Sequence, residues 1–315
     1  MSTLFLHRET DSSQHYVSNT DTQTRRTMWQ YFVSAVKVLS LFCVIHCAKL
    51  YLVNENAFQC TFYEIPAATY HPDKLPCKVL TLQDSDIKVY HGTLLVDFAP
   101  GLVQIGSFKT SHPGKVQLDG NTELLPFTNG TICVKQMYTR KGSSGNHDGA
   151  ISRMKGSLEL DVLLVECNCV RWASILMDLT YKFVAREVKT RGDPPYPIPT
   201  LRFMRVMIAV VRNLPTPKTF FVEEWINTDS DDGDHQFVKY LNNQVPHHIL
   251  NSIPQGSKAQ EITEFLVFAQ HVQWKKSQYS AFTSDYQGAG DLLTDPQIMS
   301  NPYVSPISLS FSSPY

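Results

Sequence analysis

One long helical pattern, closed by prolines, constrains the fold of this chain more than any other feature. Apolar residues recur at helical spacing from about 158 to 188, for example at Leu160, Leu163 and Cys167. The following segment, 193–199, holds four prolines, and proline ends a helix because it lacks a backbone N–H and clashes with the preceding turn. Strand-like runs lie on both sides of this helix, so we predict an α+β fold with two lobes.

The other elements follow from alternation and from turn residues. Before the long helix we expect the following elements: a strand at 92–98, a turn at 99–101, a strand at 102–106, a loop at 107–114 and a strand at 131–138. After it we expect strands at 203–211 and 219–226, an acidic loop at 229–234, a helix from 249 to 268 or beyond, and a strand at 279–284.

Composition excludes several classes of protein. With 43% hydrophobic and 18% charged residues among 315, the chain can bury a sizeable core and is neither wholly disordered nor a multi-span membrane protein. A formal net charge of −1 indicates no field suited to nucleic acid, and we expect no nucleic-acid partner. Seven scattered cysteines, an odd number, indicate free thiols in a reducing compartment, which favours a cytoplasmic location.

We divide the chain into three parts. Residues 1–56 are predicted to be a poorly ordered extension with an apolar stretch at 31–53, residues 57–300 a folded domain, and residues 301–315 a disordered tail rich in Ser and Pro. The uninterrupted centre of the apolar stretch, Val38–Ile45, is shorter than the roughly 20 residues that span a bilayer. We therefore expect an amphipathic helix and no membrane partner, with a membrane tether as the alternative.

The densest group of candidate site residues lies between 284 and 297. Three aspartates and two glycines fall within eleven residues there. Carboxylates and an amide oxygen are ligands that Mg²⁺ prefers, and the glycines would let the backbone bring Asp285, Gln287 and Asp295 together. The alternative interpretation is a polar turn without a ligand, because Asp and Gly are common in loops.

Three weaker candidates precede this segment. Lys135 interrupts a strand otherwise suited to burial, and the alternative is a lysine that extends to solvent. Gly106 to Lys109 form a short loop whose backbone N–H groups would admit phosphate oxygens. Glu223 ends an apolar strand and suits a contact with an adenine amino group, whereas a solvated glutamate on an edge strand is the alternative.

Taken in this order, the features resemble the alpha-kinases, a family of atypical protein kinases, and among them the alpha-kinase-like proteins of basidiomycete fungi. The run Asp285–Ile298 is similar to the family pattern D-x-Q-G-x-G-D-L-x-T-D-P-Q-I. Supporting similarities are Cys133-Val134-Lys135, Val222-Glu223 and 237–240, and the resemblance covers roughly 90–300. The HRD and DFG sequences of conventional protein kinases are absent from the chain.

The resemblance implies a two-lobed alpha-type kinase fold for 57–300 and an ATP- and Mg²⁺-dependent serine/threonine protein kinase that acts on a protein substrate. It implies that Lys135 contacts the ATP phosphates and pairs with Glu166, with Glu159 as the alternative partner. We expect the Lys135 ammonium to act on phosphate charge rather than on core packing, so that Lys135→Ala would leave the fold intact.

The remaining roles are also implied by the resemblance alone. Glu223 would meet the adenine, and Gly106 to Lys109 would form the phosphate loop. Asp285 would be the catalytic carboxylate toward the substrate hydroxyl. Gln287 and Asp295 would hold Mg²⁺.

The chain departs from the family after the similar run. His271 matches the first ligand of the family's zinc module, but no Cys or His follows Asp295, and zinc needs about four ligands. The family's glycine-rich substrate loop is not found beyond residue 300 either. We therefore expect no bound zinc, with His271 as a vestigial ligand, and interpret the chain as ending early or as a degenerate relative. The alternative function is a pseudokinase that binds nucleotide or partners without phosphoryl transfer.

Overall fold

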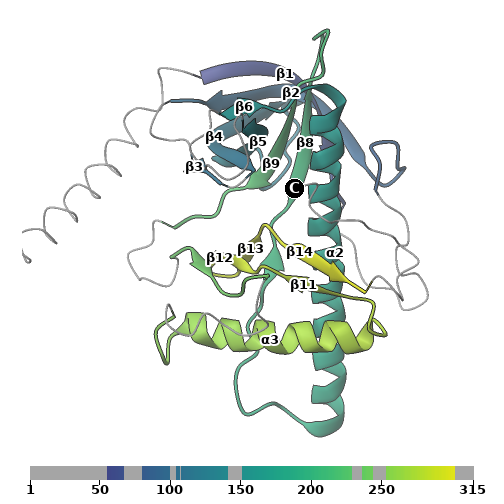
Figure 1. The fold of residues 1–315 in the computed structure, drawn as a ribbon, viewed down its shortest axis with the longest axis vertical. Helices are drawn as coiled ribbons and strands as arrows, with labels where there is room; N and C mark the ends of the chain where they lie inside the picture. Colours follow the sequence, from purple (N-terminus) through teal and green to yellow (C-terminus); the bar gives the residue numbers. More distant parts are fainter. Residues whose placement is uncertain are drawn as a thin grey trace, which may run out of the picture. The chain divides into compact units, whose positions relative to one another are not determined.

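The structure is a computed structural model (Figure 1) that describes residues 55–66, 80–99, 104–106, 108–140, 151–228, 236–243 and 253–301. The chain divides into two compact units, Met1–Val53 and Asn54–Tyr315, and every described residue belongs to the second. The apolar stretch at 31–53, the acidic loop at 229–234 and residues 302–315 of the predicted tail lie outside the described residues. Within the described ranges, no helix combines the length and apolarity needed to cross a membrane.

An antiparallel sheet forms the first lobe. Its strands are β1 (Glu55–Glu64), β2 (Lys88–Asp97), β3 (Gln104–Ile105), β4 (Lys109–Leu118), β5 (Ile132–Arg140), β6 (Ile151–Arg153), β8 (Val206–Val211) and β9 (Thr219–Glu224). The order is β3-β4-β2-β1-β8-β9-β5-β6, and β4 also pairs with β5, so that six strands close on themselves. A short 3₁₀ helix, η1 (Asp119–Asn121), follows β4. Closure gives these six strands a partner on each side and a common interior.

The interior of the closed strands is a hydrophobic core. Phe62, Leu94, Ile132, Val134 and Phe220 are completely buried in it. Successive side chains of a strand point to opposite faces, so alternate residues of each strand enter this core and the residues between them face the other way. The residues of β4, β5 and β9 that point away from this core are therefore available to form a site.

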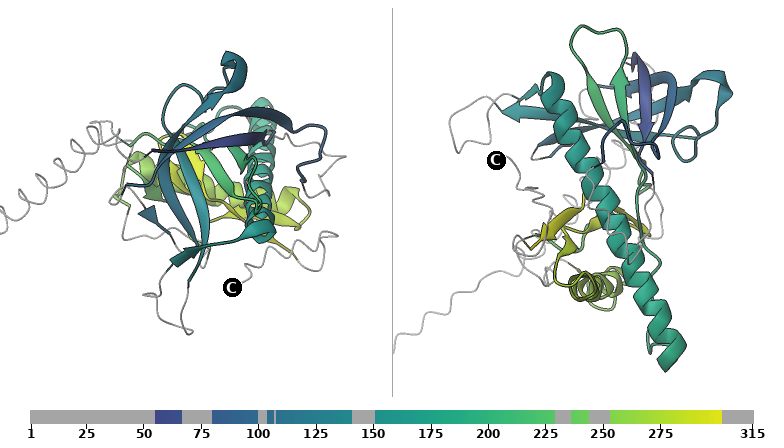
Figure 2. Two further views of the ribbon diagram at one scale, coloured as in Figure 1. Left: turned by 90° about the horizontal axis from the view of Figure 1, so that it is seen from above. Right: turned by 90° about the vertical axis from the view of Figure 1, so that its right-hand side faces the viewer.

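The predicted long helix is confirmed as α2 (Gly156–Arg191). It passes both the large sheet and the strands of the second lobe (Figure 2). The second lobe also contains α3 (Lys258–Lys276), whose first turn is capped because the side chain of Ser257 accepts a hydrogen bond from the backbone N–H of Gln260. Its strands are β7 (Arg202–Phe203), β10 (Val238–Lys239), β11 (Ala281–Ser284), β12 (Gln287–Ala289), β13 (Leu292–Thr294) and β14 (Gln297–Ser300).

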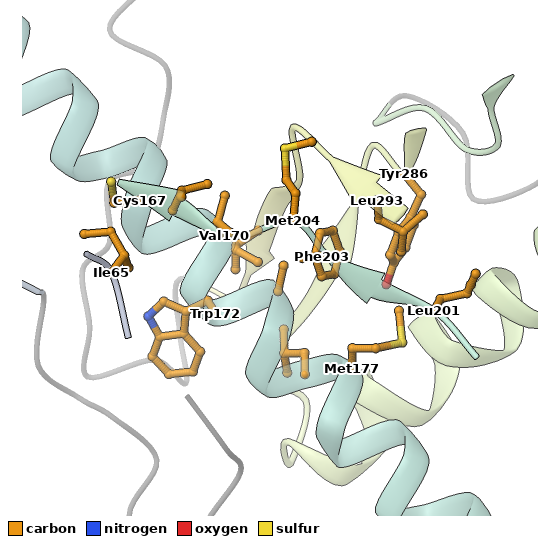
Figure 3. Packing of buried hydrophobic residues seen from close by; sticks show 14 of the residues in the cluster. Ile65, Cys167, Val170, Trp172, Met177, Leu201, Phe203, Met204, Tyr286 and Leu293 are labelled. Carbon is orange, nitrogen blue, oxygen red and sulfur yellow. The ribbon is translucent and has the colours of Figure 1, made fainter. Parts of the chain in front are cut away.

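A second core joins α2 to the strands of the second lobe (Figure 3). Cys167, Val170 and Met177 of α2 contribute one side of it. On the other side, the rings of Phe203 and Tyr286 stack with centroids 6.1 Å apart. Tyr286 follows Asp285 directly, so the packing of this core positions the backbone of the candidate catalytic residue.

The predicted loop at 107–114 is wrong from Lys109 onward, and residue 107 lies outside the described residues. Lys109–Leu118 is a continuous strand, and Pro113-Gly114 is the place where it changes partners rather than a turn. β4 pairs with β5 up to Gly114 and with β2 from Gly114 onward. A Cβ atom on Gly114 would lie 2.6 Å from the carbonyl oxygen of Leu95, so the crossing needs a residue without a side chain.

Candidate active site

Five charged side chains form one ionic network. The Nζ atom of Lys135 lies 2.8 Å from Oε2 of Glu223 and 2.8 Å from Oδ1 of Asp295. The Nζ atom of Lys109 lies 2.7 Å from Oε2 of Glu166 and 3.0 Å from the same Oδ1 of Asp295. Asp295 therefore bridges two ammonium groups, each of which has a second carboxylate of its own.

Strand register places three of these side chains on one face. Ser111 of β4 is opposite Lys135 of β5, and Cys133 of β5 is opposite Glu223 of β9. Because side chains two residues apart share a face, Lys109, Lys135 and Glu223 lie on the same side of three adjacent strands. This is the face turned away from the closed core.

Burial and mutual charge shift the pKa values in this network. Burial by itself would lower the pKa of Lys135, but Asp295 and Glu223 outweigh it and raise that pKa above its ordinary value. The pKa of Lys109 is likewise raised, against its burial, by Asp295 and Glu166. Burial would raise the pKa of Asp295, but the two ammonium groups hold it far below its usual range. Both lysines and Asp295 are therefore charged at neutral pH.

The predicted phosphate loop lies at the start of this network. The backbone N–H of Gly106 donates to the carbonyl oxygen of Lys109 at 2.9 Å, which links the end of β3 to the start of β4. The hydroxyl of Tyr138 on β5 donates to the carbonyl oxygen of Gly106. Gly106 is thus tied to the strand that carries Lys135.

Asp285 lies directly after β11, beside a third lysine. Its Oδ1 atom is 2.8 Å from Nζ of Lys239 on β10. Both Asp285 and Asp295 have a left-handed backbone, with φ values of 60° and 46°. Such a conformation is uncommon for a residue with a side chain, and it clusters at functional sites where the surrounding structure holds it.

Buried contacts of the next residue hold Asp285 in this conformation. The hydroxyl of Tyr286 is completely buried beside the side-chain amide of Gln273, whose Nε2 atom donates to it at 3.2 Å. The carbonyl oxygen of Tyr286 accepts from the backbone N–H groups of Tyr240 and Leu241 at 2.9 and 3.1 Å. These bonds join the segment that carries Lys239 to the one that carries Asp285.

A hairpin of β12 and β13 brings Gln287 to Asp295. Gln287 is opposite Thr294 in the register, and its Nε2 atom donates to Oδ2 of Asp295 at 3.2 Å. The carboxylate oxygens of Asp295 and the amide oxygen of Gln287 are of the donor type that a hard divalent cation prefers. The structure thus brings together two of the residues that the sequence predicted to converge, with Asp285 at the other end of the same short segment.

The expected partner of Lys135 was wrong. Glu166 pairs with Lys109, and the alternative partner, Glu159, pairs instead with Arg153 at 3.0 Å. Glu166 is on α2 and Lys109 starts β4, so the pair depends on how the helix lies against the closed sheet. Lys135 takes Glu223 from the neighbouring strand because register brings that residue closer.

Two alternatives from the sequence are also wrong. Lys135 does not extend to solvent, being only 6% exposed, and Glu223 is not on an edge strand, because β9 lies between β8 and β5. The carboxylate of Glu223 is 2% exposed and engaged by Lys135, so a contact with adenine stays a prediction. The expectation that Lys135→Ala leaves the fold intact is revised, because Lys135 neutralises a buried carboxylate.

Sequence reasoning missed the position of Lys239. The segment 237–240 supported the resemblance, but nothing in its spacing indicates that this lysine would contact Asp285, 46 residues later. The contact arises because β10 pairs with β12, where Lys239 is opposite Gln287. The role of Lys109 was also underestimated, since it is a member of the network and not only a loop cation.

The family model described as the alpha-kinase family matches residues 122–305. This chain belongs to the alpha-kinase family. Crystal structures similar to it include the alpha-kinase domain of myosin-II heavy chain kinase A as the apoenzyme, at 16% identity over 79% of this chain and 85% of that chain, with a TM-score of 0.42. The structure of that domain with AMP-PNP has a TM-score of 0.44 at 16% identity and covers 79% of this chain and 85% of that chain. The structure with AMP has a TM-score of 0.44 at 15% identity and covers 78% of this chain and 85% of that chain. No curated protein matches the chain.

The alpha-kinase match begins after β4 and extends just past β14. It includes Lys135, Glu223, Asp285 and Asp295 but not Lys109, which precedes it. The alpha-kinase fold is therefore shown for this chain, and the two-lobed α+β prediction is confirmed. Membership of this family supports the identification of the chain as a protein kinase.

His271, which the resemblance implies as a vestigial zinc ligand, lies on α3. His271 is exposed to solvent there. Among the residues that the structure describes, no three His, Cys, Asp or Glu side chains form a group suited to a metal ion. The expectation that this chain holds no zinc stays a prediction, which elemental analysis of the purified protein would test.

Gly288 should be indispensable to the hairpin of this alpha-kinase. A Cβ atom there would lie 1.9 Å from the backbone carbonyl oxygen of Leu292, which cannot move without breaking the hairpin. We expect Gly288→Ala to lower the free energy of unfolding by about 2–4 kcal/mol. Gly130→Ala is the matched control, since a Cβ atom there meets nothing within 4 Å. Urea denaturation measures both, and equal midpoints for the two variants would contradict the prediction.

Proposed function

We propose that this chain is an ATP- and Mg²⁺-dependent protein kinase that phosphorylates serine or threonine in a protein substrate. The observation that carries the proposal is the convergence of Lys109, Lys135 and Gln287 on the carboxylate of Asp295. Phosphoryl transfer depends mainly on positioning and on neutralising phosphate charge, and two ammonium groups and a metal-binding carboxylate held at one place would supply both.

The two buried lysines are suited to bind phosphate. Each ammonium already bridges two carboxylates, so Lys109 and Lys135 are fixed in position and remain charged. We propose that Glu166 and Glu223 keep these lysines oriented when phosphate oxygens replace Asp295 as their partner. Gly106 adds no free backbone N–H beside them, because its N–H already donates to the carbonyl oxygen of Lys109.

Asp295 and Gln287 fit a magnesium ion by the chemistry of their donors. The carboxylate of Asp295 stays ionised because its pKa is far below the ordinary value, and the amide of Gln287 lies against it. These two residues would hold the ion, which neutralises charge on the phosphates. The remaining positions of a site with two protein ligands suit water and phosphate oxygens.

Asp285 is proposed to orient the substrate hydroxyl and accept its proton. It lies on the same short segment as Gln287 and has a strained backbone that the core maintains. Lys239, at 2.8 Å, would keep its carboxylate in place and add positive charge near the transferred group. We further propose kinship with fungal alpha-kinase-like proteins, from the run at 285–298, and a cytoplasmic location.

Asp285→Asn tests the function and separates a kinase from a pseudokinase. Asparagine has the same shape and tolerates a left-handed backbone, so the fold should persist. We expect incorporation of phosphate from Mg-ATP into a basic protein substrate to fall about a thousandfold, with ATP affinity retained. The matched control is Asp291→Asn, an exposed aspartate in the same segment.

The wild-type chain decides between the two functions. A chain that binds Mg-ATP but incorporates no phosphate above the Asp285→Asn variant would be a pseudokinase, and the proposal would fail. A wild-type chain that binds no nucleotide would contradict both functions.

A further inference from the structure

A groove with an apolar floor lies far along α2 from the ionic network. It has a volume of about 660 Å³ and is lined by the last turns of α2, the proline-rich segment 193–199 and one face of α3. Figure 1 shows α3 crossing α2 above the end of α2, with the chain turning back beneath it. No residue of the proposed active site lines the groove.

Helical spacing places the groove residues of α3 on one face of that helix. Glu261, Glu264, Phe265 and Phe268 on α3 are at positions i, i+3, i+4 and i+7, and so form one face of that helix. The rings of Phe265 and Phe268 are 6.2 Å apart between centroids. These two rings form the aromatic floor of the groove. Phe268 nevertheless remains 37% exposed, so the described chain covers this floor incompletely.

The proline-rich segment adds an aromatic side chain to the third wall. Tyr196 is 60% exposed, and it lies among the four prolines that end α2. Fixed proline rings reduce the conformational entropy lost when a partner binds beside them. An aromatic floor and a rigid aromatic wall are typical of sites that bind apolar anchor residues of a peptide.

The rim of the groove is acidic. Glu187, Asp193, Glu261 and Glu264 line it, against a single cation, Arg191. Arg191 is already paired with Glu187, at 3.0 Å. The other three carboxylates have no ion-pair partner among the described residues.

We propose that this groove binds a basic and apolar peptide segment of a partner protein. The exposed aromatic rings would take its leucine or aromatic side chains, and its lysines and arginines would pair with the carboxylates of the rim. The proposal follows from charge complementarity around an exposed aromatic floor, and it does not depend on the kinase activity proposed above. Charge complementarity of this kind increases association rates and selects among partners.

Binding of synthetic peptides to the full chain tests the proposal. The probe is a fluorescein-labelled peptide of lysine, arginine, leucine and phenylalanine. One counterpart replaces its basic residues with glutamate, and another replaces its apolar residues with serine. Fluorescence anisotropy should show saturable binding of the first peptide only, weakening as the salt concentration rises.

Two variants locate the binding. Glu261→Lys with Glu264→Lys should weaken binding about tenfold or more, because the two substitutions replace negative charge on the rim with positive charge. Both positions are exposed on α3. Phe268→Ser should weaken it as well. The matched control is Glu123→Lys with Asp161→Lys, which makes the same change of net charge at exposed positions outside the groove.

Each outcome decides the proposal. Weaker binding in both groove variants, with wild-type binding in the control, supports it. Equal weakening in the control, or binding of the acidic peptide, would show a nonspecific effect and overturn it. Failure of the basic peptide to bind, or self-association of the chain that only the groove variants abolish, would also overturn it, since the occupant would not be such a partner.

Discussion

Replacing Lys135 with methionine is expected to lower phosphate incorporation about a thousandfold and to weaken the fold at the same time. The activity falls because an ammonium that would neutralise phosphate charge is lost. The fold weakens because Glu223, 2% exposed, loses its ion-pair partner at 2.8 Å. Breaking a buried pair by removing one partner costs about 3–5 kcal/mol. Urea denaturation and phosphate incorporation from Mg-ATP measure the two effects.

A double variant separates the two effects of Lys135. Lys135→Met with Glu223→Leu replaces the buried pair with apolar side chains of similar size, which is often neutral for stability. We expect the denaturation midpoint to recover most of the loss, while phosphate incorporation stays as low as in the single variant. Recovery of activity along with stability would show that Lys135 has only a structural role.

Replacing Asp295 with asparagine is expected to weaken Mg-ATP binding about a hundredfold or more. Asparagine keeps the shape and tolerates the left-handed backbone, with φ at 46°. It removes one of two proposed protein ligands of the metal ion. Isothermal titration calorimetry with Mg-ATP measures the loss.

Titration with ATP in the presence of a chelator gives the internal comparison for Asp295. The variant releases Lys109 and Lys135 from a shared carboxylate, so metal-free ATP should bind it at least as tightly as it binds the wild type. Asp291→Asn should behave as wild type in both titrations. Unchanged Mg-ATP affinity, or an equal loss with and without Mg²⁺, would contradict the assignment of Asp295 as a metal ligand.

The glycines of the chain illustrate why one predicted element was wrong. Pro113-Gly114 is typical of a turn, and sequence alone favours that interpretation. In the structure, Gly114 is the residue at which β4 passes from β5 to β2, and only glycine permits the approach of Leu95 there. A glycine that allows close contact and a glycine that allows a turn have the same local sequence pattern, and distant strands decide between them.

The sequence by itself determined the features that depend on neighbouring residues. The helical periodicity before 193–199 predicted α2. The contiguous run at 285–298 indicated the family and predicted that Gln287 and Asp295 converge. Only the tertiary structure decided the ion pairs. Lys109 meets Glu166 across 57 positions and Asp295 across 186, and Lys135 meets Glu223 because β5 and β9 are adjacent. Such contacts depend on strand register and on closure of the sheet, which no local pattern encodes, because each strand's alternation is compatible with several partners.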